Sequence, residues 1–222
     1  MKKTIFISGT DTGAGKTVLT TLLAEFLCAK GVNIAALKPL CSGGRDDAKK
    51  IHTALGDRMA LDQINPWHFR AAIAPSLAAK REKRTVTLAA VLAHIRAVQK
   101  KFDVVLVEGA GGLLSPLGEN FDSRDLIVKL DATSIIVATD KLGVVNHILL
   151  TLEALPEKLR ARSKIVLMSP CRTDTATGSN TELLAEFLPP ERIFNLPWLG
   201  KNYSTKKVLN NAQIKRTLAG LL

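Results

Sequence analysis

The stretch GTDTGAGKT, residues 9–17, follows the short apolar run TIFIS at residues 4–8 and precedes a segment with helical spacing. A phosphate-binding P-loop reads G-x-x-x-x-G-K-[ST], and its backbone N–H groups and helix start face the phosphates. The end of this pattern is present at residues 15–17, but the first glycine stands one residue early, at Gly9. The order strand, glycine-rich turn, helix still indicates a P-loop. In it Lys16 would bind phosphates and Thr17 would bind Mg²⁺.

Short apolar runs alternate with segments of helical period along the rest of the chain. Strands are predicted at 4–8, 34–37, 102–107, 134–139 and 164–168. Helices are predicted at 16–30, 47–55, 88–101, 146–155 and 181–188, with Gly31 as the stop signal of the first. This alternation is typical of βαβ units with right-handed crossovers. It predicts one α/β domain over residues 1–222, with a single doubly wound, mostly parallel sheet flanked by helices.

The composition is that of a globular protein with a basic surface. Lys and Arg number 31 against 20 Asp and Glu, giving a net charge of +11, and the basic residues are dispersed. Only one tyrosine is present, so a stacking surface for nucleic acid is not indicated. A solvated basic face is favoured over a nucleic-acid site. A basic pocket for anionic ligands explains the charge equally well. The apolar runs are shorter than the roughly 18 residues of a membrane span. The three cysteines are scattered and lack the spacing of metal ligands, which favours free thiols in a reducing cytoplasm.

Two further motifs follow predicted strands, where ligands bind in doubly wound sheets. In VEGAGG, residues 107–112, Glu108 ends a hydrophobic strand, as the second magnesium contact of nucleotide-binding folds does. The alternative is a glycine turn with a solvated glutamate. In KPLCSGGRDDA, residues 38–48, Lys38 is as compatible with a surface role as with a catalytic one, and Asp46 suits a helix N-cap. Only the expected nearness of this motif to the P-loop favours a functional role for its residues.

With these motifs in view, the sequence resembles the dethiobiotin synthetase family. The resemblance rests on GTDTGAGKT (9–17), KPLCSGG (38–44), NPWHF (65–69), VEGAGGLLSPL (107–117), DKLGVVNH (140–147) and LPWLGKN (196–202). It implies a homodimer that uses ATP, Mg²⁺ and CO₂ to close the ureido ring on diaminopelargonate. A substrate amine would form a carbamate, which attacks the γ-phosphate to give a carbamic-phosphoric anhydride. The second amine then closes the ring.

The resemblance also implies the residues of the site. The catalytic residues would be Lys38, Lys16 and Thr12, and the metal would be held by Thr17, Asp47 and Glu108. ATP would be bound by Gly13, Ala14, Gly15, Lys16, Thr17, Val18, Asp47, Glu108, Gly109, Ala110, Gly111, Ser169, Pro197, Trp198 and Leu199. Substrate would be bound by Thr12, Lys38, Ser42, Gly111, Gly143, Val144 and Asn146, with the DKLGVVNH segment coming from the neighbouring subunit. Asp47 is preferred to Asp46 as metal ligand because it directly precedes Ala48.

One departure and one alternative bear on this interpretation. Ser169 stands where the family usually has the asparagine that contacts adenine, which predicts loose nucleotide selectivity. The alternative is a DNA-binding, partitioning-type P-loop ATPase, which would suit the net charge. Those proteins carry a lysine where this chain has Asp11, and the chain lacks a concentrated basic patch. Binding to nucleic acid or membrane is therefore not expected.

Overall fold

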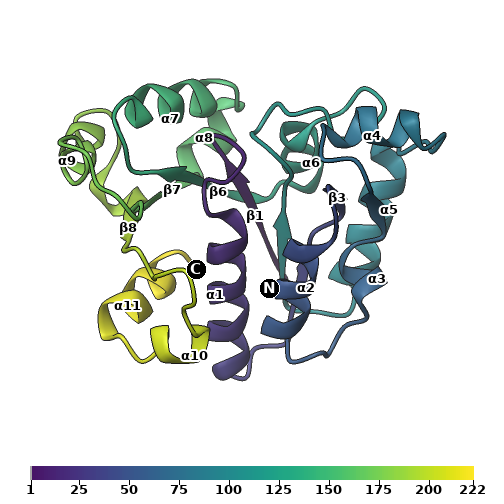
Figure 1. Cartoon of the computed structure of the whole chain (residues 1–222), viewed down its shortest axis with the longest axis horizontal. Coiled ribbons are helices and arrows are strands. Elements are labelled where there is room, and N and C mark those ends of the chain that lie inside the picture. Colours follow the sequence, from purple (N-terminus) through teal and green to yellow (C-terminus); the bar gives the residue numbers. More distant parts are fainter. Residues whose placement is uncertain (1) are drawn as a thin grey trace.

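The computed structural model describes residues 2–222 and is built around a six-stranded parallel sheet (Figure 1). The strand order is β2-β5-β1-β6-β7-β8. The strands are β1 (Lys3–Gly9), β2 (Ile34–Leu37), β5 (Val104–Glu108), β6 (Thr133–Thr139), β7 (Lys164–Met168) and β8 (Ile193–Leu196). A separate two-stranded parallel sheet joins β3 (Leu40–Ser42) to β4 (Trp67–Phe69).

Eleven α-helices and one short 3₁₀ helix are present in residues 2–222. They are α1 (Lys16–Ala29), α2 (Asp46–Ala54), α3 (Leu61–Ile64), α4 (Pro75–Arg81), α5 (Leu88–Gln99), α6 (Ser123–Leu130), α7 (Val144–Glu153), α8 (Glu157–Arg162), α9 (Ser179–Ala185), η1 (Pro190–Arg192), α10 (Thr205–Val208) and α11 (Ala212–Gly220). No helix in this part of the chain is long and apolar enough to cross a membrane.

The sheet is doubly wound about its central strand, β1, which pairs with β5 on one side and β6 on the other. From β1 the chain passes through α1 to β2, on the β5 side, and later returns from β5 through α6 to β6. These two crossovers run in opposite directions, so equal right-handedness puts α1 and α6 on opposite faces. The predicted fold class is thereby confirmed, and all six strands are parallel.

Helix α1 shows why the local sequence folds as it does. Its side chains at Leu19, Leu22 and Leu23 are fully buried against the sheet. The helix ends in a Schellman arrangement: Gly31, with a φ of 73°, donates to the Cys28 carbonyl, and Val32 donates to the Leu27 carbonyl. Gly31 thus acts as the predicted stop signal, one residue after the helix cap.

Several predicted boundaries differ from the structure. The helix predicted at 146–155 begins two residues earlier, at Val144, because Gly143 takes a φ of 85° and lets the chain turn directly into it. The helix predicted at 181–188 spans Ser179–Ala185. The strand predicted at 102–107 begins at Val104 and includes Glu108. The proposed N-cap role of Asp46 is wrong, since Arg45 holds the cap position and Asp46 is the first helical residue.

Six parallel strands bring their carboxyl ends to one edge of the sheet. Ile7 of β1 is in register with Glu108 of β5, so the loop after Gly9 and the loop after Glu108 leave the sheet side by side. Lys38 follows β2, which pairs with β5 on the side opposite β1, so Lys38 lies at the same edge of the sheet.

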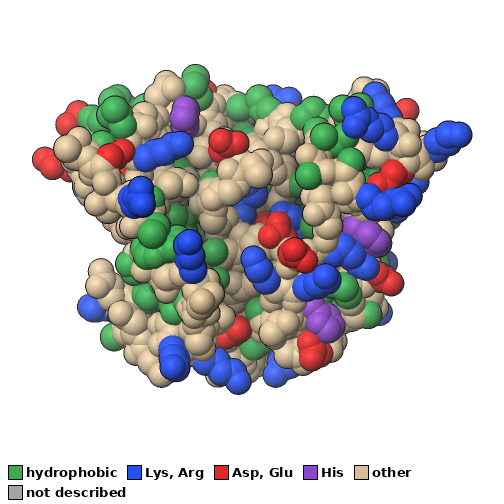
Figure 2. Space-filling view, viewed as in Figure 1, with side chains coloured by type: hydrophobic (Ala, Val, Ile, Leu, Met, Phe, Trp, Pro, Cys, Tyr) green, Lys and Arg blue, Asp and Glu red, His purple; other side chains and the backbone are tan. Residues whose placement is uncertain are grey.

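The charged side chains on the surface are mixed. Figure 2, viewed as in Figure 1, shows Lys and Arg side chains spread over this face, with acidic side chains among them rather than a single basic patch.

Candidate active site

The loop of residues 9–17 lies between β1 and α1 and requires its glycines. Gly13 and Gly15 have φ angles of 75° and 99°, a region that favours glycine. A Cβ on Gly15 would lie 3.0 Å from the Met168 side chain, and one on Gly9 would lie 3.1 Å from Lys16 Nζ. The early glycine therefore leaves room for the Lys16 side chain, whose ammonium donates to the Asp11 carbonyl over 2.8 Å.

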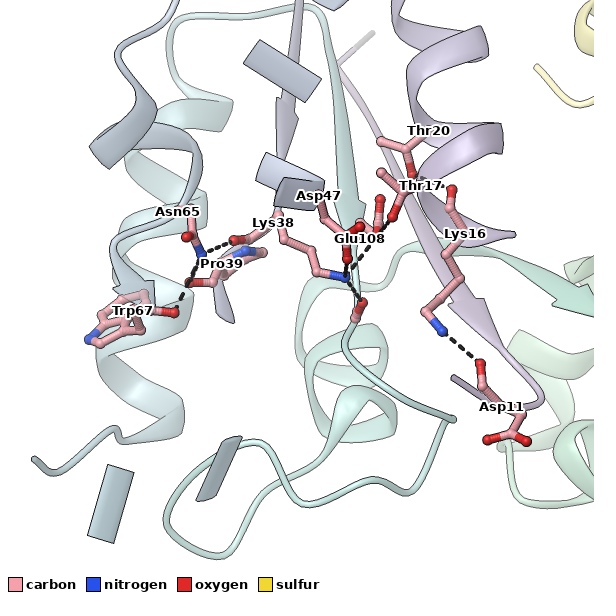
Figure 3. Close-up of polar contacts among 11 residues, drawn as sticks. Asp11, Lys16, Thr17, Thr20, Lys38, Pro39, Asp47, Asn65, Trp67 and Glu108 are labelled. Carbon is pink, nitrogen blue, oxygen red and sulfur yellow. Dashed lines mark hydrogen bonds and ion pairs between the residues drawn. The ribbon is translucent and has the colours of Figure 1, made fainter. Parts of the chain in front are cut away.

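A buried polar cluster surrounds Glu108 at the end of β5 (Figure 3). Lys38 Nζ donates to Glu108 Oε1 over 2.7 Å and to the Gly109 carbonyl over 2.9 Å. Thr17 Oγ1 donates to the same Glu108 oxygen, also over 2.7 Å. Asp47 Oδ2 lies 3.4 Å from Lys38 Nζ. The structure thus brings together two strand ends, those of β2 and β5, and the first turns of α1 and α2 around one carboxylate.

This cluster has the chemistry of a divalent cation site. Glu108 is 1% exposed, and its second oxygen, Oε2, is buried without a hydrogen-bond partner. A buried carboxylate oxygen left unpaired is costly, so this oxygen is available to a cation. Within residues 2–222 no group of three or more His, Cys, Asp or Glu side chains could hold a metal by itself. Mg²⁺ in nucleotide sites needs only one or two carboxylates, completed by phosphate and water oxygens.

The two acidic residues of the 38–48 motif are the first two residues of α2 and point in different directions. Asp47 points toward Lys38, whereas Asp46 lies at the surface and pairs with Lys49 over 3.4 Å. Asp47 therefore pairs with Lys38 beside Glu108, whereas Asp46, which lines the same cavity, pairs with Lys49.

The two lysines of the site differ in their charge behaviour. Burial, followed by repulsion from the Lys38 ammonium, lowers the pKa of Lys16 to about 8. Burial also acts to lower the pKa of Lys38, but the adjacent Glu108 and Asp47 carboxylates outweigh it and raise this pKa above its usual value. Lys38 is thus a fixed cation, whereas the lowered pKa of Lys16 lets it lose its proton at about pH 8.

A cavity of about 680 Å³ opens over this cluster. Among the predicted site residues it is lined by Thr12, Gly13, Gly15, Lys16, Thr17, Val18, Lys38, Ser42, Asp47, Ala110 and Gly111. Sequence reasoning missed Lys50, Ser115 and the segment 72–75, which also line it. Three lysines and several loop backbones make this a cavity for an anionic ligand. Lys50 could have been found from its position one turn after Asp46 on α2.

A second cavity of about 300 Å³ adjoins the first and shares Gly13, Gly15 and Val18 with it. The predicted residues Ala14, Ser169, Pro197, Trp198 and Leu199 all line it. Residues not predicted complete its wall: Thr139, Met168, Pro170, Cys171, Gly200 and Tyr203. Its apolar and aromatic lining suits a planar ring.

The residues Gly143, Val144 and Asn146 lie apart from these cavities, at the start of α7. Val144 is buried, and its N–H donates to the Lys141 carbonyl over 3.1 Å, while Asn146 is exposed. The same chain therefore does not bring them to the Lys38 cluster. Their predicted role in substrate binding requires a neighbouring subunit.

Comparison with known proteins gives a consistent result over most of the chain. A family model described as an AAA domain matches residues 3–203. The ATP-dependent dethiobiotin synthetase of Methanocaldococcus jannaschii is 35% identical over 201 residues, covering 88% of this chain and 92% of that protein. The protein of the same name from Anaeromyxobacter sp. is 41% identical over 174 residues, covering 77% and 78%. The chain belongs to the ATP-dependent dethiobiotin synthetase family.

Solved structures that resemble this dethiobiotin synthetase family member include two ParA proteins. A ParA family ATPase from Chlorobium tepidum TLS has a TM-score of 0.60 at 18% identity, covering 98% of this chain and 96% of that one. The pNOB8 ParA bound to nonspecific DNA has a TM-score of 0.59 at 14% identity, covering 100% and 97%. Similarity at this level of identity establishes the shared fold alone.

Proposed function

We propose that this chain is an ATP-dependent dethiobiotin synthetase that joins diaminopelargonate and CO₂ into the ureido ring of dethiobiotin, releasing ADP and phosphate. One observation carries the proposal. In a member of this family, Lys16, Lys38, Thr17 and Asp47 line one cavity beside the buried Glu108 carboxylate. That set combines phosphate-binding cations with metal-binding oxygens, which phosphoryl transfer requires.

ATP would lie across the two adjoining cavities. The base would enter the smaller, apolar cavity beside Trp198, and the phosphates would reach Lys16 and the loop amides in the larger one. Thr17, Asp47 and Glu108 would hold Mg²⁺, and the unpaired Oε2 of Glu108 supports this. Magnesium, when bound, supplies neutralisation of the phosphate charge.

Lys38 would hold the carbamate. When CO₂ adds to a substrate amine, that nitrogen loses a proton and the product is an anion. A cation with a raised pKa keeps its charge at neutral pH and stabilises this anion without giving up a proton. A carbamate oxygen then attacks the γ-phosphate, and ADP leaves. The second amine attacks the carbamoyl carbon of the anhydride and expels phosphate, with Thr12 and Ser42 lining the cavity near Lys38.

A homodimer completes the proposed site. Leu114 and Leu150 are 51% and 62% exposed and line a shallow cavity of about 480 Å³ together with Thr10 and Gly112. Exposed apolar residues gathered in this way are typical of a protein interface. In the dimer, Asn146 and the start of α7 of one subunit would receive the substrate's distant carboxylate at the other subunit's site. A cytoplasmic location accords with this biosynthetic role.

The deciding experiment is ADP release by the purified protein with diaminopelargonate, with CO₂ supplied or removed. Release that requires both substrates supports the proposal, and formation of dethiobiotin by mass spectrometry identifies the product. ATP turnover that ignores either substrate, or that is stimulated by DNA instead, would refute it.

A further inference from the structure

A fully buried asparagine, Asn65, holds the backbone of Lys38 in place. Its side-chain Nδ2 donates to the Lys38 carbonyl over 2.7 Å, with longer contacts of 3.4 Å to the Pro39 and Trp67 carbonyls (Figure 3). Asn65 is 0% exposed and lies between α3 and β4, 27 residues from Lys38 in sequence. A buried amide is retained only where its hydrogen bonds are made, because leaving them unmade is costly.

Arg45 fixes the orientation of this amide. Its Nε donates to Asn65 Oδ1 over 3.1 Å, and its Nη2 donates to the Asn65 and Leu61 carbonyls over 2.9 and 3.0 Å. Arginine has only donors, so the amide oxygen must face Arg45 and the amide nitrogen must face Lys38. Arg45 immediately precedes α2, which carries Asp47. The same contact thus links the position of Asp47 to that of Lys38.

Two backbone hydrogen bonds complete the hold on the turn after β2. Lys38 N donates to the Ile64 carbonyl over 3.0 Å, and Trp67 N donates to the Pro39 carbonyl over 3.1 Å. The Lys38 side chain leaves this turn and ends 2.7 Å from Glu108 Oε1. Lys38 is therefore fixed at both ends, and within residues 2–222 Asn65 makes the only side-chain hydrogen bond to its carbonyl.

We propose that Asn65, oriented by Arg45, is a positioning residue that sets where the Lys38 ammonium lies during the reaction. The inference rests on the proposed role of Lys38 and goes beyond it. Asn65 lines neither of the two cavities assigned to ligands, so it acts through Lys38 rather than on the substrate. A small displacement of a catalytic group reduces turnover steeply, by up to about a hundredfold for 1 Å.

Two substitutions separate positioning from simple support of the fold. Asn65→Asp keeps an oxygen acceptor for Arg45 but removes the donor to the Lys38 carbonyl, whereas Asn65→Ala removes both. We expect both variants to lower kcat by roughly tenfold to a hundredfold, with the KM for ATP and the affinity for ADP changed by less than about twofold. If Asn65 served only to bind Arg45, Asn65→Asp would keep wild-type kcat, and the inference would be overturned.

Ser134→Ala is the matched control. Ser134 is also buried and makes a buried side-chain hydrogen bond, to Ser163 over 2.6 Å, but it lies at the opposite end of the strands. We expect it to lower the melting temperature without lowering kcat. A kcat loss in Ser134→Ala as large as that in the Asn65 variants would show that kcat only follows stability, and would overturn the inference.

A double variant tests whether Asn65 acts through Lys38. Lys38→Ala/Asn65→Asp is expected to turn over no more slowly than Lys38→Ala alone, and multiplied losses would overturn the inference. If neither Asn65 variant folds, Arg45→Gln takes their place, and a wild-type kcat for it would count against the inference. Lys38→Ala with normal turnover would instead refute the proposed role of Lys38. Normal turnover in the Asn65 variants with an inactive Lys38→Ala refutes the positioning role alone.

Discussion

Lys38 and Glu108 form an ion pair in which both side chains are almost completely buried, 4% and 0% exposed. Removing one member of such a pair leaves the other charge without compensation. Lys38→Ala is therefore expected to lower turnover by about a hundredfold or more, and to destabilise the fold by about 3 kcal/mol or more. ADP release and denaturant unfolding measure the two effects. Lys38→Ala/Glu108→Gln should regain stability but not turnover, and recovery of both would contradict a catalytic role.

Glu108→Gln tests the proposed metal site. It keeps the shape of the side chain and removes the charge that a divalent cation needs. We expect the Mg²⁺ concentration for half-maximal ADP release to rise by about tenfold or more. Protection of the folded protein by Mg²⁺ and ADP, followed by melting temperature, should weaken in parallel. An unchanged Mg²⁺ requirement by both measurements would exclude Glu108 as a ligand.

The pKa of Lys16 predicts how nucleotide binding depends on pH. Burial and the neighbouring Lys38 lower this pKa from 10.5 to about 8, so the ammonium loses its proton as the pH rises through that value. Above about pH 8 the affinity for ADP should fall, by up to about tenfold per pH unit. Calorimetry in buffers of different ionisation enthalpy should detect proton uptake on binding. Lys16→Gln is the control, and the same pH dependence in that variant would contradict the assignment.

The same shift has an opposite consequence for the unliganded fold. Between about pH 8 and 10.5 the unfolded chain holds the Lys16 proton and the folded chain does not. The contribution of Lys16 to the free energy of unfolding therefore rises with pH across this window. The difference between wild type and Lys16→Gln, followed by urea unfolding at several pH values, measures it. A difference that falls with pH would contradict the lowered pKa.

Ser169 is expected to leave the base of the nucleotide weakly selected. It lines the smaller cavity, whose other walls include Met168, Pro170 and Trp198. A base held mainly by apolar contacts is distinguished only weakly from other bases, because its hydrogen-bonding groups contribute little to binding. We expect other nucleoside triphosphates to support turnover within about tenfold of ATP, and Ser169→Asn to widen the preference for ATP. Strict use of ATP by the wild type would contradict this prediction.

A mixture of two inactive variants can test the shared site. In a mixed dimer of Lys38→Ala with Asn146→Ala, one site carries both changes and the other carries neither. Random mixing should restore about a quarter of wild-type activity, measured at low substrate concentration. Sedimentation establishes that the dimers have exchanged. Exchange without recovered activity would contradict a site built from two subunits.

Sequence patterns predicted the strands well where burial in the core requires a run of apolar residues. Strands β6 and β7 have continuous apolar stretches, residues 135–138 and 165–168, because both faces of the sheet are covered. The edge strand Ile193–Leu196 was missed because it is short and only its last residue is buried. Strands β3 and β4 were also missed, because each is only three residues long and because they pair segments that are distant in the sequence.

The candidate site was predictable where its residues lie next to the predicted ends of strands. Lys38, Glu108 and Thr17 each occupy a position next to a predicted element boundary, and parallel strands put those boundaries at one edge. The contact of Asn65 with the Lys38 carbonyl was not predictable, because no periodic pattern relates the two positions. Nor could spacing show that one Glu108 oxygen accepts from both Lys38 and Thr17 while the other has no partner.

The wall that the two ligand cavities share has a consequence for inhibitor chemistry. Gly13, Gly15 and Val18 border both cavities, and Gly15 has a φ of 99°, so a side chain there would strain the backbone and lie 3.0 Å from the Met168 side chain. A flat aromatic head group placed beside Trp198 could therefore carry a short acidic tail past this wall toward Lys16. Resistance by substitution at Gly15 would be difficult, because any larger residue there would disturb the loop that the enzyme needs for its own nucleotide.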